Sequence, residues 1–261
     1  MASPVVDKVT FCVLTYGDYP RMATRVIESI QRHCPRAEYR LVVGANAVSN
    51  PTLSFLESLE RGGDIDDLIV HEENLNKCPM MRRMFERVGT NLVWWFDDDS
   101  YIVDPAAFDH WRRCVGQASS ETVMWGKVAV CDHPSAFAPG LPDAVAFVRS
   151  ADWYRGLTPP SWKLGGRGEF DYAGHGTGDG RWFFVLGGCW MIRTRVIRAL
   201  DWPDRRLEKL GDDVFLGEAI RQNGWRLQNI DGPGVAIDTE PRRGAAGAFS
   251  ELKADNYEAP F

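Results

Sequence analysis

The sequence lacks the features that mark membrane-spanning, secreted and zinc-binding proteins. No apolar stretch approaches the ~20 residues needed to span a bilayer, and the start, MASPVVDKVTFCVLTYG, has no basic segment of the kind that opens a signal peptide. None of the six cysteines forms a CxxC pair or a cluster with histidine at zinc-like spacing. We therefore expect a soluble protein of the reducing cytoplasm, without a transmembrane segment.

The chain also lacks an excess of positive charge. Its net charge is −6, so bulk attraction to nucleic acid or to an anionic membrane is not expected. Only 6 of its 30 basic residues are lysines, and arginine suits bidentate contact with phosphate or carboxylate. With 44% hydrophobic and 25% charged residues, the 261 residues suffice for one large α/β domain or two small ones.

The first hundred residues alternate between strand and helix patterns. Runs rich in β-branched and aromatic residues are followed by segments whose apolar residues have helical spacing. This alternation predicts a Rossmann-like, mostly parallel sheet flanked by helices. The expected strands are Lys8–Tyr16, Tyr39–Val43, Leu68–Val70 and Leu92–Phe96; the expected helices are Arg21–His33, Thr52–Arg61 and Asn76–Val88, with a loop at Gly44–Pro51.

The second half is less regular. Segment Ala151–Arg181 is glycine-rich, and such a long loop is usually a functional lid or a disordered insert. Its aromatic residues argue against plain disorder. The other expected elements are helices at Pro105–Gln117, Leu141–Arg149, Arg195–Leu200 and from Asp212 to Asn223, and strands at Thr122–Val130, Trp182–Arg193, Leu227–Ile230 and Val235–Ile237.

Three adjacent carboxylates, Asp97, Asp98 and Asp99, follow the buried strand expected at Leu92–Phe96. Adjacent acids repel one another and are costly to desolvate, and a cation beside them would relieve that cost. Ligands of open α/β sheets bind at the carboxyl ends of the strands. The triplet therefore indicates a hard-cation site that receives a phosphate-bearing ligand. The alternative is an acidic turn that caps the next segment.

Two later features need a joint explanation with the triplet. Gly187-Gly188 interrupts a strongly apolar run, which is typical of a bulge or of a place where a ligand or another backbone approaches closely. Asp212-Asp213 opens a helix, where both acids could simply cap the helix and favour its dipole.

All three features, in this order after a β-α-β start, resemble GT-A-fold glycosyltransferases, especially family 2 and the fringe-like β-glycosyltransferases. The corresponding segments are FDDDSY, which holds the DxD motif, LGGCWMIRTRVI and GDDVFLGEAI, and the resemblance covers roughly residues 8–230. It implies a single GT-A domain over 1–261. Residues 8–103 would form the nucleotide-sugar-binding half, 104–240 the acceptor-binding and catalytic half, and 241–261 a C-terminal tail.

The resemblance also implies a metal site. Asp97 and Asp99 would be the outer acids of the DxD motif and would hold Mn²⁺ or Mg²⁺, which suits an oxygen-rich site. Asp98 would reach the ribose or the donor sugar. Many family members supply a late histidine as a further metal ligand, and this chain has no histidine there. Asp238 stands near that position and would replace it, or water would fill it.

The remaining donor contacts follow from the same resemblance. Thr15 and Tyr16 match the place where the family holds the base and the ribose. Arg82 would meet the nucleotide or the diphosphate, the alternative being an arginine on a solvated helix face. Gly187 and Gly188 would let the donor sugar lie against the backbone.

The acid pair at Asp212-Asp213 would carry the chemistry. A carboxylate behind the acceptor hydroxyl can take its proton, which is worth typically ~10²–10⁴-fold in rate. The resemblance assigns this role to Asp213, with Asp212 bound to the acceptor or orienting its partner. One base acting by direct displacement implies inversion at the anomeric carbon.

The resemblance therefore implies a metal-dependent transferase that takes its sugar from a nucleotide-diphosphate sugar, uridine diphosphate being the family's commonest carrier. A nucleotidyltransferase on a similar fold is one alternative, although its usual Gly-rich loop is missing from GDYPRMATR after the first strand. A catalytically inactive sugar-nucleotide-binding protein is another, against which the intact acids argue. The default acceptor is a saccharide or glycoconjugate, and a protein or a modified DNA base is the alternative.

Overall fold

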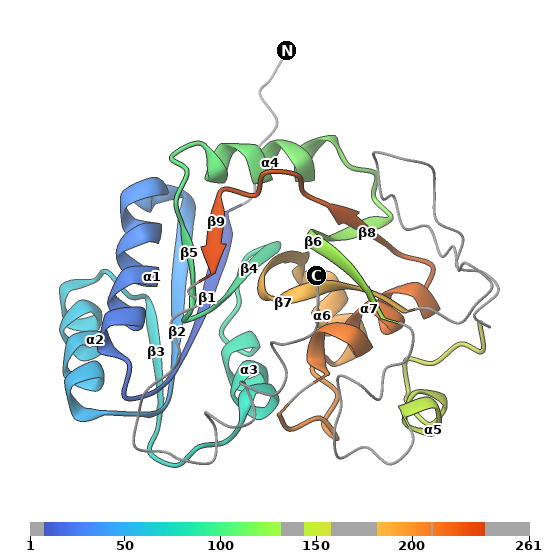
Figure 1. Ribbon diagram of the computed structural model, residues 1–261, viewed down its shortest axis with the longest axis horizontal. Coiled ribbons are helices and arrows are strands. Elements are labelled where there is room, and N and C mark those ends of the chain that lie inside the picture. Colours follow the sequence, from blue (N-terminus) through green and yellow to red (C-terminus); the bar gives the residue numbers. More distant parts are fainter. Residues whose placement is uncertain (1–7, 132–143, 158–181, 210, 238–261) are drawn as a thin grey trace.

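The computed structural model describes residues 8–131, 144–157, 182–209 and 211–237 (Figure 1). The strands are β1 (Val9–Gly17), β2 (Tyr39–Val48), β3 (Asp67–His71), β4 (Leu92–Asp97), β5 (Ser100–Ile102), β6 (Thr122–Cys131), β7 (Trp182–Arg193), β8 (Arg226–Asn229) and β9 (Val235–Ile237). The helices are α1 (Pro20–His33), α2 (Asn50–Gly62), α3 (Lys77–Phe85), α4 (Ala107–Gln117), α5 (Ala144–Arg149), α6 (Thr194–Leu200) and α7 (Asp212–Gln222), with a 3₁₀ turn, η1, at Arg36–Glu38.

A seven-stranded sheet has the strand order β3-β2-β1-β4-β7-β6-β8, and β5 pairs with β9 in a second sheet of two strands. The first four strands are parallel, and β8 is parallel to β6. Strand β7 is antiparallel to both of its neighbours, β4 and β6. The prediction of a mostly parallel α/β sheet flanked by helices is therefore confirmed.

Helices cover both faces of this sheet, as the alternation of side chains along β1 requires. Phe11 and Val13 belong to the core that contains the buried residues of α1, α2 and α4. Cys12 and Leu14 point to the other face, whose core contains the buried residues of α3, α6 and α7. Residues on both faces of β1 are buried, which explains its continuous apolar sequence.

Strand β2 extends to Val48. The prediction that a loop begins at Gly44 was therefore wrong. Glycine and asparagine disfavour strands in isolation, but here the segment pairs with β1 on one side and β3 on the other. Gly44 also lies close to α3, because a Cβ there would come within 2.6 Å of Met84 Sδ. Pairing and close packing thus override the turn signal.

Strand β5 was also missed by the sequence analysis. It follows the acid triplet directly and pairs with β9, Tyr101 lying opposite Ala236. Asp98 and Asp99 therefore form the tight turn between β4 and β5. The acids do occupy a turn, and that turn lies at the carboxyl edge of the main sheet.

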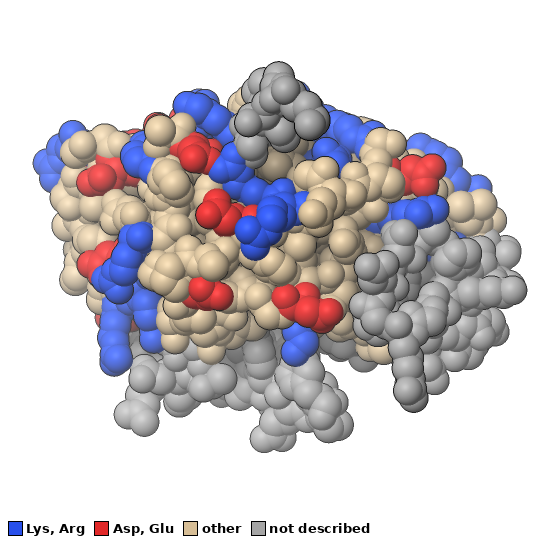
Figure 2. All heavy atoms as spheres, turned by 90° about the horizontal axis from the view of Figure 1, so that it is seen from above, with Lys and Arg blue, Asp and Glu red and all other residues tan. Residues whose placement is uncertain are grey.

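The surface carries charges of both signs. On the face that Figure 2 shows, lysine and arginine side chains are interspersed with aspartate and glutamate. Arg112 of α4 forms an ion pair with Glu38 of η1. Within the described ranges, no helix is long and apolar enough to span a bilayer.

Candidate active site

Asp97 ends β4 at the centre of the sheet, opposite Leu14 of β1. Its Oδ1 accepts a hydrogen bond from Trp95 Nε1 at 3.0 Å. Its Oδ2 lies 3.2 Å from the ammonium nitrogen of Lys77. These two contacts hold the Asp97 carboxylate at the edge where the sequence predicts a ligand site.

Asp98 and Asp99 are buried in the turn that follows, 4% and 6% exposed. The Tyr16 backbone N–H donates a hydrogen bond to Asp98 Oδ2 at 3.3 Å. The structure therefore brings Tyr16 to the acid triplet. The side chain of Thr15 is engaged within the sheet, since its hydroxyl donates to the Gly44 carbonyl at 3.0 Å. A nucleotide contact by either residue stays a prediction.

Lys77 joins the predicted donor acids to the predicted catalytic acids, and the sequence analysis did not single it out. Its Nζ lies 3.2 Å from Asp97 Oδ2 and 3.2 Å from Asp212 Oδ2. Its side chain is 20% exposed. Burial alone would lower the pKa of this ammonium, but the carboxylates of Asp212, Asp97 and Asp213 outweigh burial and hold the pKa well above its usual value. Lys77 is therefore a fixed positive charge within the acid cluster.

A polar network supports the loop that presents Lys77. The buried Asn46 side chain accepts a hydrogen bond from Leu75 N–H at 2.9 Å and donates to Asn74 Oδ1 at 3.0 Å. Asn76, directly before Lys77, has φ 68° and ψ 171°, a combination that costs non-glycine residues roughly 1–3 kcal/mol. The strained turn aims the first residue of α3 at the acids.

Asp212 and Asp213 begin α7, as predicted, after Gly211 in a left-handed conformation with φ 85°. Burial, followed by the negative charge of Asp212, raises the pKa of Asp213 to about 7, and Lys77 opposes this shift. Burial also raises the pKa of Asp212, against the opposing effect of Lys77. Val214 N–H donates to Asp213 Oδ1 at 2.8 Å, so this oxygen is directed to the backbone of its own helix.

The two glycines of β7 lie beside these groups. A Cβ at Gly187 would come within 3.3 Å of Asp213 Oδ2 and 3.4 Å of Lys77 Nζ. A Cβ at Gly188 would lie 2.9 Å from Ser100 Oγ. The glycines therefore leave room for the protein's own side chains. Their predicted contact with a donor sugar stays a prediction.

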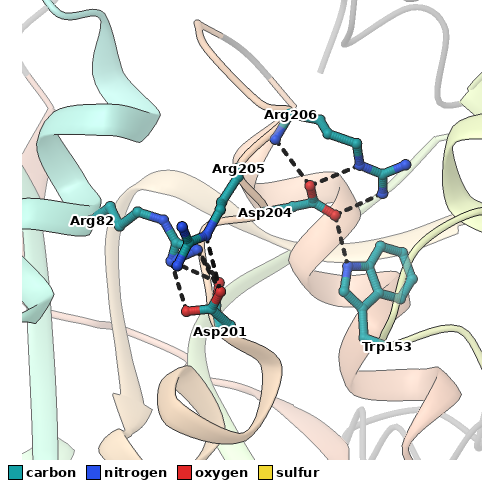
Figure 3. A network of polar contacts seen from close by, with 6 residues as sticks. All are labelled: Arg82, Trp153, Asp201, Asp204, Arg205 and Arg206. Carbon is teal, nitrogen blue, oxygen red and sulfur yellow. Dashed lines mark hydrogen bonds and ion pairs between the residues drawn. The ribbon is translucent and has the colours of Figure 1, made fainter.

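Arg82 lies on α3, where it forms an ion pair with Asp201 after α6. Its two terminal nitrogens make hydrogen bonds of 2.8 to 2.9 Å to the Asp201 carboxylate and carbonyl. Figure 3 shows Arg82 and Arg205 converging on Asp201, while Arg206 and Trp153 contact Asp204. This network ties α3 to the segment after α6, and the predicted nucleotide contact of Arg82 remains untested by it.

The donor set suits a divalent cation that binds together with phosphate. Over the residues that the structure describes, no group of three or more His, Cys, Asp or Glu side chains is arranged to hold a metal. Asp238, predicted as a further ligand, lies outside the described residues. Mg²⁺ in nucleotide sites usually takes one or two carboxylates and completes its shell with phosphate oxygens and water. Asp97 at the end of β4 and Asp99 in the turn after it could supply these carboxylates.

Comparison with known proteins assigns the fold. The mannosyltransferase PcManGT from Pyrobaculum calidifontis, in complex with GDP-Man and Mn²⁺, shares 16% identity with a TM-score of 0.58, over 88% of this chain and 56% of that one. S. aureus TarS 1–349 shares 14% identity with a TM-score of 0.57, over 86% of this chain and 58% of that one. The chain thus spans a little over half the length of these two solved chains.

The sequence itself assigns the family. A search of curated protein sequences finds no match. The profile of "Glycosyltransferase like family 2" matches residues 7–254, which is nearly the whole chain and includes every element described above. We conclude that the chain belongs to glycosyltransferase family 2 and has the GT-A fold.

Proposed function

We propose that this protein transfers a sugar from a nucleotide-diphosphate sugar to an acceptor hydroxyl, with inversion at the anomeric carbon. The observation that carries the proposal is Asp213, a carboxylate with a pKa of about 7 at the start of α7. It lies beside Lys77, which contacts Asp97 at the end of β4. A general base works best with a pKa near the operating pH, and this one is next to the predicted donor acids.

The residues at the end of β4 would bind the donor. Asp97 and Asp99 would hold Mn²⁺ or Mg²⁺, which when bound would neutralise the charge that grows on the departing diphosphate. Asp98 and Tyr16, already joined by a hydrogen bond, would lie along the ribose. Structures of PcManGT with GDP-Man and of TarS with UDP-GlcNAc support a nucleotide-sugar donor of this kind.

Asp213 would take the acceptor proton on Oδ2. Its Oδ1 accepts the hydrogen bond from Val214 N–H, whereas Oδ2 lies towards Gly187. The acceptor oxygen forms its bond to the anomeric carbon as the bond from that carbon to the diphosphate breaks, and the hydroxyl proton passes to Oδ2. Attack opposite to the leaving group inverts the anomeric configuration. The default acceptor is a saccharide or glycoconjugate.

Two substitutions test this assignment. The donor sugar would first be identified from a panel of UDP- and GDP-sugars. Asp213→Asn should still bind this donor, as measured by thermal shift with Mn²⁺. Its rate of sugar transfer should fall about 10²–10⁴-fold. Asp99→Asn should lose the metal-dependent shift. NMR of the first-formed product should show the anomeric configuration opposite to that of the donor.

Asp109→Asn provides the matched control, because Asp109 is an exposed acid in the first turn of α4. It should bind donor and transfer sugar as the wild type does. Transfer at the wild-type rate by Asp213→Asn would show that another group takes the proton. A product with retained configuration would rule out the single displacement.

A further inference from the structure

Lys77 lies beside residues of all three sequence motifs and contacts two of them. It lies 3.2 Å from Asp97 of the acid triplet and 3.2 Å from Asp212 of the acid pair. Its Nζ is also 3.4 Å from the position that a Cβ would take at Gly187. One ammonium thus links segments that are more than a hundred residues apart in the chain.

The position of Lys77 is unfavourable unless the acids compensate it. Lysine is the first residue of α3, and a cation at a helix N-terminus faces the positive end of the helix dipole. The side chain is also largely buried, with the Trp95 ring 5.9 Å from its nitrogen. A buried charge is retained where it is paired and hydrogen-bonded, and the two carboxylates supply that pairing.

The segment around Lys77 fixes the ammonium in this place. Asn46 bonds to the loop before it, and Cys78 N–H, directly after it, donates to the Glu208 carbonyl at 2.9 Å. Glu208 lies shortly before α7. A backbone hydrogen bond therefore joins the start of α3 to the segment before Asp212 and Asp213, in addition to the ion pair of Lys77. The backbone on both sides of Lys77 is thus fixed by hydrogen bonds within the site.

We propose that Lys77 is the resident counter-cation of this site, occupying the carboxylates in the donor-free enzyme and weakening the binding of a divalent metal that arrives alone. The inference rests on the proposed function, because Asp97 is a predicted metal ligand. A metal that binds Asp97 must share that carboxylate with the ammonium, and two cations at close range repel each other. A nucleotide diphosphate brings the negative charge that both cations need, so it relieves the conflict.

The first measurement is Mn²⁺ binding in the absence of nucleotide, followed by the electron paramagnetic resonance signal of free Mn²⁺. Lys77→Gln removes the ammonium and leaves the carboxylates. It should bind Mn²⁺ at least about tenfold more tightly than the wild type, because removing a neighbouring positive charge changes the affinity for a cation by at least that factor. UDP or GDP without metal should bind the variant more weakly. Equal or weaker Mn²⁺ binding by Lys77→Gln would overturn the proposal.

Thermal unfolding gives a second readout that tolerates a less stable variant. Without its cation the acid cluster should destabilise Lys77→Gln, and Mn²⁺ alone should raise its unfolding midpoint by several degrees more than that of the wild type. K⁺ at matched ionic strength should not. A purely structural role for Lys77 would lower the midpoint without this metal-specific recovery, and that result would also overturn the proposal.

Two further variants complete the test. Lys77→Arg keeps a cation and should bind Mn²⁺ as weakly as the wild type. Arg83→Gln makes the same change of charge at an exposed position of α3 and should leave Mn²⁺ binding unchanged. If the wild type binds no nucleoside diphosphate even with Mn²⁺, the proposed function fails, whereas tight Mn²⁺ binding by Lys77→Gln alone would still support the exchange of cations.

Discussion

The raised pKa of Asp213 determines the pH dependence that we predict for sugar transfer. Burial and the neighbouring Asp212 hold its pKa at about 7, so below that pH the carboxyl keeps its proton and cannot act as a base. We predict that kcat/KM rises about tenfold per pH unit up to about pH 7 and then levels, because one deprotonation controls the rate. Initial rates from pH 5 to pH 9 at fixed metal and donor would show this.

Asp212→Asn gives the control for the pH profile. Because the charge of Asp212 raises the pKa of Asp213, removing it should move the inflection to lower pH. A flat profile between pH 5 and pH 8 in the wild type would contradict the assignment of Asp213 as the base.

The raised pKa of Asp213 also makes the free energy of unfolding depend on pH. In the folded state the protonated form is favoured relative to the unfolded chain, so the stabilisation is present at low pH and is lost as the pH rises through about 7. Because this loss begins above the ordinary aspartate pKa of about 3.9, Asp213→Asn should raise the free energy of unfolding at both pH 5 and pH 8, and by more at pH 8. Urea unfolding at the two pH values would measure the difference.

Individual site residues differed in how far they could be predicted. Asp97, Asp98, Asp99, Asp212 and Asp213 stand out because adjacent acids are costly to bury, and the structure places Asp97 of the triplet and Asp212 of the pair against one ammonium. Lys77 was missed because nothing local connects position 77 with 97 or 212. Its one signal was chemical, a lysine at the start of a helix, where cations are disfavoured.

At the scale of elements, α7 depends on close packing against β7. A Cβ at Gly217 would come within 2.2 Å of the Phe183 carbonyl oxygen, so the helix can approach the strand only because that position is glycine. We predict that Gly217→Ala lowers the free energy of unfolding by about 1–3 kcal/mol, the usual cost of overpacking, and reduces transfer, because displaced α7 carries Asp213. Chemical unfolding and initial rates would measure both.

Gly116→Ala in α4 is the matched control. A Cβ there meets no heavy atom within 4 Å, so the alanine should stabilise the helix by about 0.5–1 kcal/mol. If both substitutions were stabilising, the close approach of α7 to β7 could not be what positions the acid pair.

Elements with strong periodicity could be predicted, and those formed by long-range pairing could not. Helix α1 shows buried Val26, Ile27 and Ile30 at helical spacing, and it forms where expected. The end of β2 and the short β5 carry no comparable pattern, since their strand conformation comes from neighbours distant in sequence. The type of an element follows from its own residues, but its extent depends on its partners.

At the scale of the molecule, sequence predicted the parallel first half but not the arrangement of the second. The insertion of β7 between β4 and β6, antiparallel to both, brings Gly187 to the edge that holds Asp97. Apolar runs such as β7 indicate burial on both faces but carry no information on the neighbour or its direction. Only the complete sheet explains why the acid pair, which follows β7 in the chain, meets the acid triplet.

Helix α7 is held by charged groups at its start and in its second half. Asp212 at its start contacts Lys77 from the first half of the chain. Near its end, Glu218 and Arg221 form an ion pair of which the side chains are only 4% and 3% exposed. Arg221 Nη2 donates to the Leu157 carbonyl at 2.7 Å, and Gln222 Oε1 accepts from Leu157 N–H at 3.0 Å. These contacts fix α7 against the segment after α5.

Arg221→Met should therefore lower the free energy of unfolding by about 3–5 kcal/mol, because it leaves the Glu218 carboxylate buried without its cation. Replacing both partners, Glu218→Gln with Arg221→Met, removes the uncompensated charge and should recover at least about 1–2 kcal/mol of that loss. Arg205→Met breaks an exposed pair with Asp201, 78% and 68% exposed, and should cost no more than about 1 kcal/mol. Urea unfolding of all three variants would measure these terms. A double variant no more stable than Arg221→Met would show that packing and the Leu157 contact, rather than the buried charge, hold this part of α7.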